Sequence, residues 1–174
     1  MDTITLRKSF VNDIPAIEAL YRRVAAVEGG LARKASEITT HYVEDFVSKS
    51  INNGTEIVAV TNEPGRIIGE IHCYVLAIET FWHVLTDVTI AVDPEYQGKG
   101  VGRKLFTELL VDVRDNRPDI HRIELIARES NLRAIAFYES LGFLKEGRLR
   151  NRIKRSDGRF EDDIVMGWVR DSAM

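Results

Sequence analysis

The stretch IAVDPEYQGKGVG, residues 90–102, joins the end of an apolar run to the start of an amphipathic segment. Glycines alternate with other residues at positions 98, 100 and 102. In a strand–loop–helix unit the first helical N–H groups have no partner inside the helix, and the helix dipole favours an anion beside them. Glycines let phosphate oxygens approach the backbone, and Lys99 and Arg103 add positive charge. The stretch predicts a phosphate-binding loop, with a glycine-rich turn that binds nothing as the alternative.

The elements around this loop interleave helices with strands, which predicts an α/β (α+β) domain with a mixed sheet. Periodicity and turn residues place strands at 3–8, 56–61, 66–77, 83–92, 122–127, 143–155 and 160–169. Four helices are expected: from Asn12 or Asp13 to the glycines at 29–30, from Thr39 or Thr40 to Asn53, from the glycine loop to Asn116, and from Asn131 to Leu141. Residues 62–65 carry a turn signal.

The last two strands are joined by Asp157-Gly158, which is a two-residue hairpin signal. That turn would place Lys154 opposite Glu161 and Arg152 opposite Asp163, so that unlike charges face each other. The face would either receive an acidic group or be a solvated, internally balanced surface, and the opposing acids favour the second interpretation. The cations that recur at every second residue of this strand are Arg148, Arg150, Arg152 and Lys154.

The composition is that of an ordinary globular chain and argues against several classes of protein. The 174 residues suffice for one domain, which we expect to span 1–174, and the net charge of -3 gives no general attraction to nucleic acid. The single Cys73 cannot form an internal disulfide or a cysteine-based zinc site. No signal peptide or membrane-length apolar run is recognisable, so we expect a cytoplasmic protein that does not bind membranes. No metal is expected, because metal-ligand spacing is absent among His41, His72, His83 and His121.

The spacing of the glycines limits which phosphate-containing ligands the loop is expected to bind. The loop lacks the Lys-Ser/Thr end of a P-loop. A dinucleotide fold requires Gly-x-Gly-x-x-Gly after the first strand of its unit, whereas this loop reads Gly-x-Gly-x-Gly and follows several strands. Glu124 lies about where a ribose-binding acid would fall, so a nucleotide-binding oxidoreductase stays open as an alternative.

A second motif, NLRAIAFYESLGF at residues 131–143, follows downstream. Together with the first, it resembles the GNAT superfamily of acetyltransferases, whose pyrophosphate signature Gln/Arg-x-x-Gly-x-Gly/Ala fits residues 97–102. The resemblance covers essentially the whole chain. It implies a mostly antiparallel sheet of about seven strands, splayed between strands 4 and 5 and flanked by four helices. It also implies acetyl transfer from acetyl-CoA to a primary amine by direct attack in a ternary complex; a non-catalytic acyl-CoA-binding module is the alternative.

The resemblance also assigns roles to residues. Backbone groups of Ile90 and Val92 would pair with the pantetheine arm, Asn131 would contact that arm, and Tyr138 would protonate the departing thiolate. Asn131 and Tyr138 are seven residues apart, which independently places them on one helix face. The residues expected to bind the pyrophosphate are Gln97, Gly98, Lys99, Gly100, Val101, Gly102 and Arg103.

The acceptor amine needs a base, because an alkyl ammonium has a pKa of about 10.4. Some members of the family use a carboxylate on the fourth strand, and here Asp87, beside Thr86, is the candidate. Glu70 and His72 on the preceding strand are further candidates, and a water relay is the alternative. Cys73 lies in a strand and is expected to pack rather than to react.

The acceptor is expected between residues 27–38 and 150–162. The loop at residues 28–33 and the hairpin at residues 147–163 look similar to a bacterial branch that acetylates amino acids, small amines or protein N-termini. They do not identify the amine. The resemblance also makes a homodimer an expectation, since dimers are common in the family.

Overall fold

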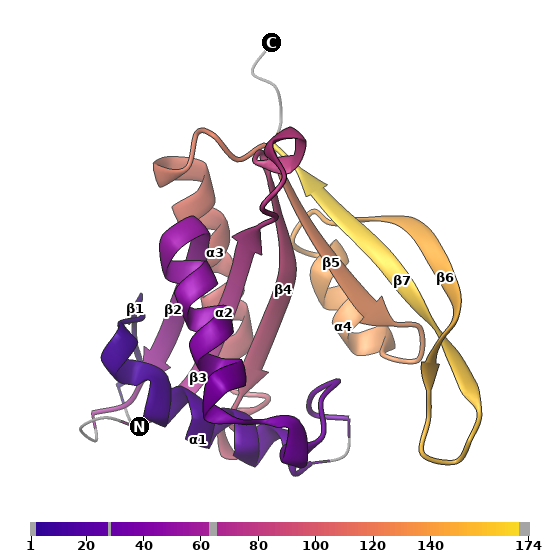
Figure 1. The fold of residues 1–174 in the computed structure, drawn as a ribbon, viewed down its shortest axis with the longest axis horizontal. Coiled ribbons are helices and arrows are strands. Elements are labelled where there is room, and N and C mark those ends of the chain that lie inside the picture. Colours follow the sequence, from indigo (N-terminus) through magenta and orange to yellow (C-terminus); the bar gives the residue numbers. More distant parts are fainter. Residues whose placement is uncertain (1–2, 28, 63–65, 171–174) are drawn as a thin grey trace. The chain divides into compact units, whose positions relative to one another are not determined.

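The computed structural model describes residues 3–27, 29–62 and 66–170. Glu28 and residues 63–65 of the expected turn lie outside them. The strands are β1 (Thr5–Lys8), β2 (Gly54–Val60), β3 (Ile67–Val75), β4 (Val84–Val92), β5 (Arg122–Arg128), β6 (Leu144–Lys154) and β7 (Phe160–Val169). The helices are α1 (Ile14–Ala25), α2 (Thr40–Asn53), α3 (Val101–Asn116) and α4 (Leu132–Glu139), all drawn in Figure 1. The expected order of strands and helices is confirmed.

The strands form one seven-stranded sheet in the order β1-β2-β3-β4-β5-β7-β6. Four pairs, β1–β2, β2–β3, β5–β7 and β6–β7, are antiparallel, whereas β4 and β5 run parallel. The parallel pair is short, because Val84 and Leu85 pair with Arg122 and Ile123 and both strands continue beyond that pairing. The mixed, mostly antiparallel sheet expected from the sequence is therefore confirmed.

The chain divides into two compact units, and β4 contributes to both. Unit 1 holds the residues up to Tyr74 together with Thr89–Arg117, and unit 2 holds Val75–Val88 with the residues from Pro118 onward. In unit 1, helices α1 and α2 cover one face of the sheet and share a core with Val58 and Ala91. Helix α3 covers the opposite face, where an added Cβ on Gly69 would lie only 2.8 Å from Leu105 Cδ1. Glycine at position 69 thus lets α3 pack closely.

The hairpin of unit 2 corrects the expected register. Lys154 pairs with Phe160, and Ile153 pairs with Glu161, so the predicted opposition of Lys154 and Glu161 is wrong. The turn is longer than two residues: the Arg155 carbonyl accepts the Gly158 N–H at 3.0 Å, and Gly158 has a φ of 84°. A three-residue loop that ends on a left-handed glycine accounts for the one-residue difference.

The charge balance expected for this hairpin nevertheless exists with different partners. Arg155 takes the place expected for Lys154, with Nη1 lying 3.6 Å from a Glu161 oxygen. Arg152 lies 3.7 Å from Asp163, although Leu149 is the residue paired with Asp163 in the ladder. The face is therefore an exposed and internally paired surface.

No helix within the described ranges is long and apolar enough to cross a membrane. The cytoplasmic location stays a prediction.

Candidate functional site

The glycine loop of unit 1 is built by backbone conformations that only glycine adopts without strain. Gly98 has a φ of 74° and Gly100 a φ of 81°, both in the left-handed region. A Cβ added at either position would meet no atom within 4 Å, so the requirement is conformational and the space beside the loop is open. Gly102 differs, because an added Cβ would make ordinary contacts of 3.7 Å with Ile90 and Val92.

The start of α3 places the N–H groups of its first turn beside this open space. The cap residue Gly100 has no side-chain oxygen to satisfy them, and the first N–H to bond back is that of Lys104, which donates to the Gly100 carbonyl at 3.0 Å. The N–H groups at the start of the helix therefore have no intrahelical partner. Exposed Lys99 lies over the Tyr96 ring at 4.9 Å, which keeps a cation beside the loop. These features suit an anion with several oxygens.

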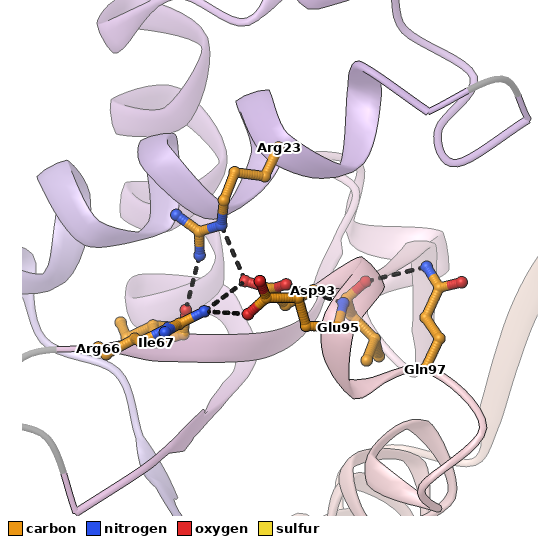
Figure 2. Close-up of polar contacts among 7 residues, drawn as sticks. Arg23, Arg66, Ile67, Asp93, Glu95 and Gln97 are labelled. Carbon is orange, nitrogen blue, oxygen red and sulfur yellow. Dashed lines mark hydrogen bonds and ion pairs between the residues drawn. The ribbon is translucent and has the colours of Figure 1, made fainter.

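A buried carboxylate anchors the loop to the rest of unit 1 (Figure 2). Asp93, only 1% exposed, accepts a bond from Arg23 Nε at 2.8 Å. Its other oxygen accepts the N–H of Glu95 at 3.1 Å and so caps the short turn that follows. Its own N–H donates to the Ile68 carbonyl at 2.8 Å. Asp93 thereby fixes the end of β4 to both α1 and β3.

Three further contacts shown in Figure 2 hold the approach to the loop. Arg66 Nη2 lies 2.6 Å from Glu95 Oε2 and 3.8 Å from Asp93 Oδ2. Gln97 Nε2 donates to the Val92 carbonyl at 3.1 Å. The Gln97 side chain, expected among the pyrophosphate-binding residues, thus ties the loop back to its own strand. The anchoring roles of Arg23 and Arg66 were missed, because a surface arginine far away in sequence gives no signal of its partner.

In unit 2, Asn131 and Tyr138 mark the two ends of α4. Asn131 is the residue before the helix, and its Oδ1 accepts the Ala134 N–H at 3.1 Å. Its side-chain oxygen therefore serves as the cap, which leaves Nδ2 as the donor for a ligand. Tyr138 is half-buried, and burial raises the pKa of its hydroxyl. The hydroxyl consequently keeps its proton at neutral pH, as a proton donor must.

Asp87 lies where the strand β4 is distorted. Its φ of 54° is in the left-handed region, which interrupts the regular alternation of the strand at an exposed position. A distortion at this point changes the direction in which the Asp87 and Thr86 side chains leave the strand. Whether this carboxylate acts as the base stays a prediction.

The further candidates, Glu70 and His72, are both buried in unit 1. His72 Nδ1 lies 3.0 Å from Glu70 Oε1, and the Tyr21 hydroxyl donates to Glu70 Oε2 at 2.5 Å. Glu56, 3% exposed, lies opposite His72 in the β2–β3 register. We refer to Tyr21, Glu56, Glu70 and His72 as the buried cluster. Tyr21 and Glu56 were missed, although a glutamate beside the apolar run of β2 was a signal.

The remaining reactive groups give no second centre. Burial raises the pKa of the Cys73 thiol to about 12, so it stays protonated and is a poor nucleophile. Among the residues that the structure describes, no group of three or more histidine, cysteine or acidic side chains could hold a metal ion.

Comparison with known proteins decides the family. The model of the acetyltransferase (GNAT) family matches residues 25–143, which is more than half of the chain. The chain belongs to this family. The matched range includes the glycine loop, α4 and the buried cluster except for Tyr21. The GNAT resemblance inferred from the two motifs is thus confirmed.

Individual relatives extend this result. The chain is 48% identical over 77 residues to the [ribosomal protein bS18]-alanine N-acetyltransferase of Escherichia coli K12, a match that covers 44% of this chain and 50% of that relative. The match thus spans about half the length of that relative.

Two solved structures share the fold over nearly the whole chain. An acetyltransferase of the GNAT family from Streptococcus pneumoniae superposes with a TM-score of 0.84 at 22% identity, covering 96% of this chain and 99% of the other. The ribosomal-protein-S18-alanine N-acetyltransferase from Escherichia coli gives a TM-score of 0.76 at 25% identity, covering 99% and 97%. The GNAT fold is therefore established for the full chain.

Proposed function

We propose that this GNAT member transfers the acetyl group of acetyl-CoA to a primary amine by direct attack in a ternary complex, with residues 1–174 acting as one catalytic domain. One observation carries the proposal. The loop before α3 holds Gly98 and Gly100 in left-handed conformations beside open space, at the positive end of the helix. That arrangement suits the pyrophosphate of coenzyme A.

The loop and its strand would bind the donor mainly through backbone groups. The pyrophosphate would accept from N–H groups of the segment Gln97, Gly98, Lys99, Gly100, Val101, Gly102 and Arg103. The pantetheine arm would pair with the backbone of Ile90 and Val92, as an added strand does at an open sheet edge. Asn131 Nδ2 would donate to the same arm.

The chemistry itself needs a proton acceptor and a proton donor. Attack by the amine nitrogen on the thioester carbon forms the C–N bond and breaks the C–S bond. Tyr138, whose pKa is raised by burial, would give its proton to the thiolate, whose basicity is near that of a free cysteine. Asp87 is one candidate for the proton acceptor.

For the acceptor, we propose an α-amine of a protein N-terminus or an amino acid ahead of an alkyl amine. The similarity to an alanine N-acetyltransferase supports this choice. So does the chemistry, because an α-amine has a pKa of about 7.7–8.0 and loses its proton more easily than an alkyl ammonium. A homodimer remains an expectation from the family.

Calorimetry and a release assay test the proposal. Acetyl-CoA is expected to bind at micromolar concentrations and NAD not to bind; NAD binding without acetyl-CoA binding would contradict it. A panel of peptide, amino-acid and alkyl amines should then release free coenzyme A thiol. Binding without release for any amine would favour the non-catalytic module.

Tyr138→Phe tests the proposed acid. We expect a fall of about 100-fold in kcat, with acetyl-CoA affinity within about twofold of the wild type. A large loss of affinity instead would make Tyr138 a binding residue.

A further inference from the structure

Three members of the buried cluster form a closed triangle of hydrogen-bonding atoms. The Tyr21 hydroxyl lies 2.5 Å from Glu70 Oε2 and 3.2 Å from His72 Nδ1, and His72 Nδ1 lies 3.0 Å from Glu70 Oε1. Tyr21 and Glu70 are 0% exposed. The three side chains come from α1 and β3, which are distant in sequence, so the triangle is a product of the fold.

The titratable and polar groups that face Glu70 offer no permanent positive charge. They are Tyr21 from α1, Glu56 from β2 and His72 on its own strand, with Tyr42 of α2 beside Tyr21. Among the described residues, no lysine or arginine forms an ion pair with Glu56 or Glu70. Burying an unpaired carboxylate is costly, so such a group tends to hold a proton.

The affinity of Glu70 for a proton suits a base that works near neutral pH. Burial raises the pKa of Glu70 to about 8, while the hydrogen bond from Tyr21 acts in the opposite direction. A general base is most effective when its pKa lies near the working pH. A group that only filled space would be better replaced by an apolar side chain, so this carboxyl invites a functional explanation.

Tyr21 of the triangle shares a core with Ala91 of β4, the strand proposed to hold the acetyl donor, whereas Ile90 and Val92 contact the α3 side. His72, which is 2% exposed, connects the triangle with the half-buried Tyr74. Its ring stacks on Phe46 at 4.1 Å and is parallel to the Tyr74 ring at 6.3 Å.

We propose that Glu70, held by Tyr21 and reached through His72, accepts the proton that the acceptor ammonium must lose before attack. This proposal rests on the proposed acetyl transfer. The N–H bond of the ammonium breaks and its proton passes by way of His72 to the Glu70 carboxylate, while the nitrogen pair forms the new C–N bond. The thiolate takes its proton from Tyr138, and the proton on Glu70 returns to solvent after the product leaves.

The test is the pH dependence of kcat at saturating concentrations of an alkyl amine. The pKa of that amine, about 10.4, lies above the window from pH 6 to 9.5, so a rise within the window belongs to the enzyme. The wild type should rise to a plateau with a midpoint near pH 8. Glu70→Gln should lower kcat about 100-fold and remove the rise, with the dissociation constant of acetyl-CoA unchanged.

Two further variants separate the relay from a structural role. Glu56→Gln is the control for loss of a buried carboxyl, because Glu56 is 3% exposed and lies outside the triangle. It should keep kcat at the plateau and the rise of kcat with pH, whereas Glu70→Gln should lose both. Tyr21→Phe removes a bond that lowers the pKa of Glu70, so the midpoint should move to higher pH. If Glu70→Gln does not fold, an unmoved midpoint in Tyr21→Phe overturns the proposal.

The outcomes distinguish this proposal from the proposed function. If the wild type acetylates amines and Glu70→Gln keeps both its kcat and its midpoint, the relay is wrong and the acetyl transfer stands. Loss of the rise in Asp87→Asn but not in Glu70→Gln would assign the base to Asp87. If the wild type releases no thiol with any amine, the proposed function fails and the relay fails with it.

Discussion

The glycine loop and the buried cluster lie in the same unit and would handle charge in opposite ways. The loop is exposed and offers backbone N–H groups to an anion, with Gly98 and Gly100 in open space. The cluster is closed to solvent, and three of its side chains hydrogen-bond with one another. The difference teaches that binding the donor needs backbone shape, whereas moving a proton needs side chains held in a medium that shifts their pKa.

The largest effect on donor binding is expected from a substitution that distorts the loop and leaves the cluster intact. Gly100→Val forces a β-branched residue into a left-handed conformation at φ 81°, which costs about 2 kcal/mol unless the loop moves. We expect acetyl-CoA affinity, measured by calorimetry, to fall about 30-fold or more. Gly102→Ala is the matched control, since its added Cβ makes only ordinary contacts, and it should bind within about threefold. Equal affinities for all three proteins would contradict the assignment of the loop.

A change in the cluster should alter stability and spare donor binding. Burial, and then the nearby Glu70, raise the pKa of Glu56 to about 8, against about 4.3 for an unfolded chain. Between these values the folded state binds more protons, so the free energy of unfolding falls as pH rises through about 8. Glu56→Gln should remove about 4 kcal/mol of that fall between pH 5 and 9.

Chemical denaturation at several pH values measures this effect. Glu70 still titrates in the variant, so part of the fall should remain. Acetyl-CoA affinity should equal that of the wild type at each pH. If the free energy of unfolding of the variant falls with pH as much as that of the wild type, folding does not raise the pKa of Glu56.

The smallest effect is expected at Asp93, the residue that links the loop to the core. Asp93→Asn removes the charge that holds Arg23 but keeps an oxygen to accept the Glu95 N–H. Because Arg23 is half-exposed and can be solvated, we expect a loss of only about 1–2 kcal/mol in the free energy of unfolding. Acetyl-CoA affinity should fall a few-fold as the loop loosens. Glu95→Gln, on a side chain that is 71% exposed, should change neither quantity measurably; an equal loss in both variants would remove Asp93 from its anchoring role.

The comparison also explains what the sequence could predict. The loop is contiguous, and its glycines, the strand before it and the helix after it can be read in one stretch, so its place between strand and helix was predicted. In the triangle, Tyr21 lies about 50 residues along the chain from Glu70 and His72. Its hydrogen bonds therefore exist only after α1 packs on β3. Glu70 and His72 were recognised as polar residues in a strand, whereas Tyr21 was assigned only to the apolar stripe of its helix.

The hairpin shows a different limit. Asp157-Gly158 correctly located the turn, but the choice between a two-residue and a three-residue loop depends on whether Gly158 alone takes the left-handed conformation. The three-residue loop shifts the pairs next to the turn, Lys154–Phe160 and Ile153–Glu161, by one position. The register irregularity between Leu149 and Ile153 shifts the later pairs further. Long arginine side chains then restored the opposition of charges from neighbouring positions, so the balance was predictable although the register was not.

The central claim is that the glycine loop holds the pyrophosphate of acetyl-CoA. The most direct measurement compares, by calorimetry, the binding of acetyl-CoA and of acetyl-pantetheine, which lacks the pyrophosphate. The wild type should bind acetyl-CoA about 100-fold more tightly or better, a difference of about 2.7 kcal/mol, and Gly100→Val should lose most of that preference. Equal binding of the two compounds by the wild type would contradict the claim.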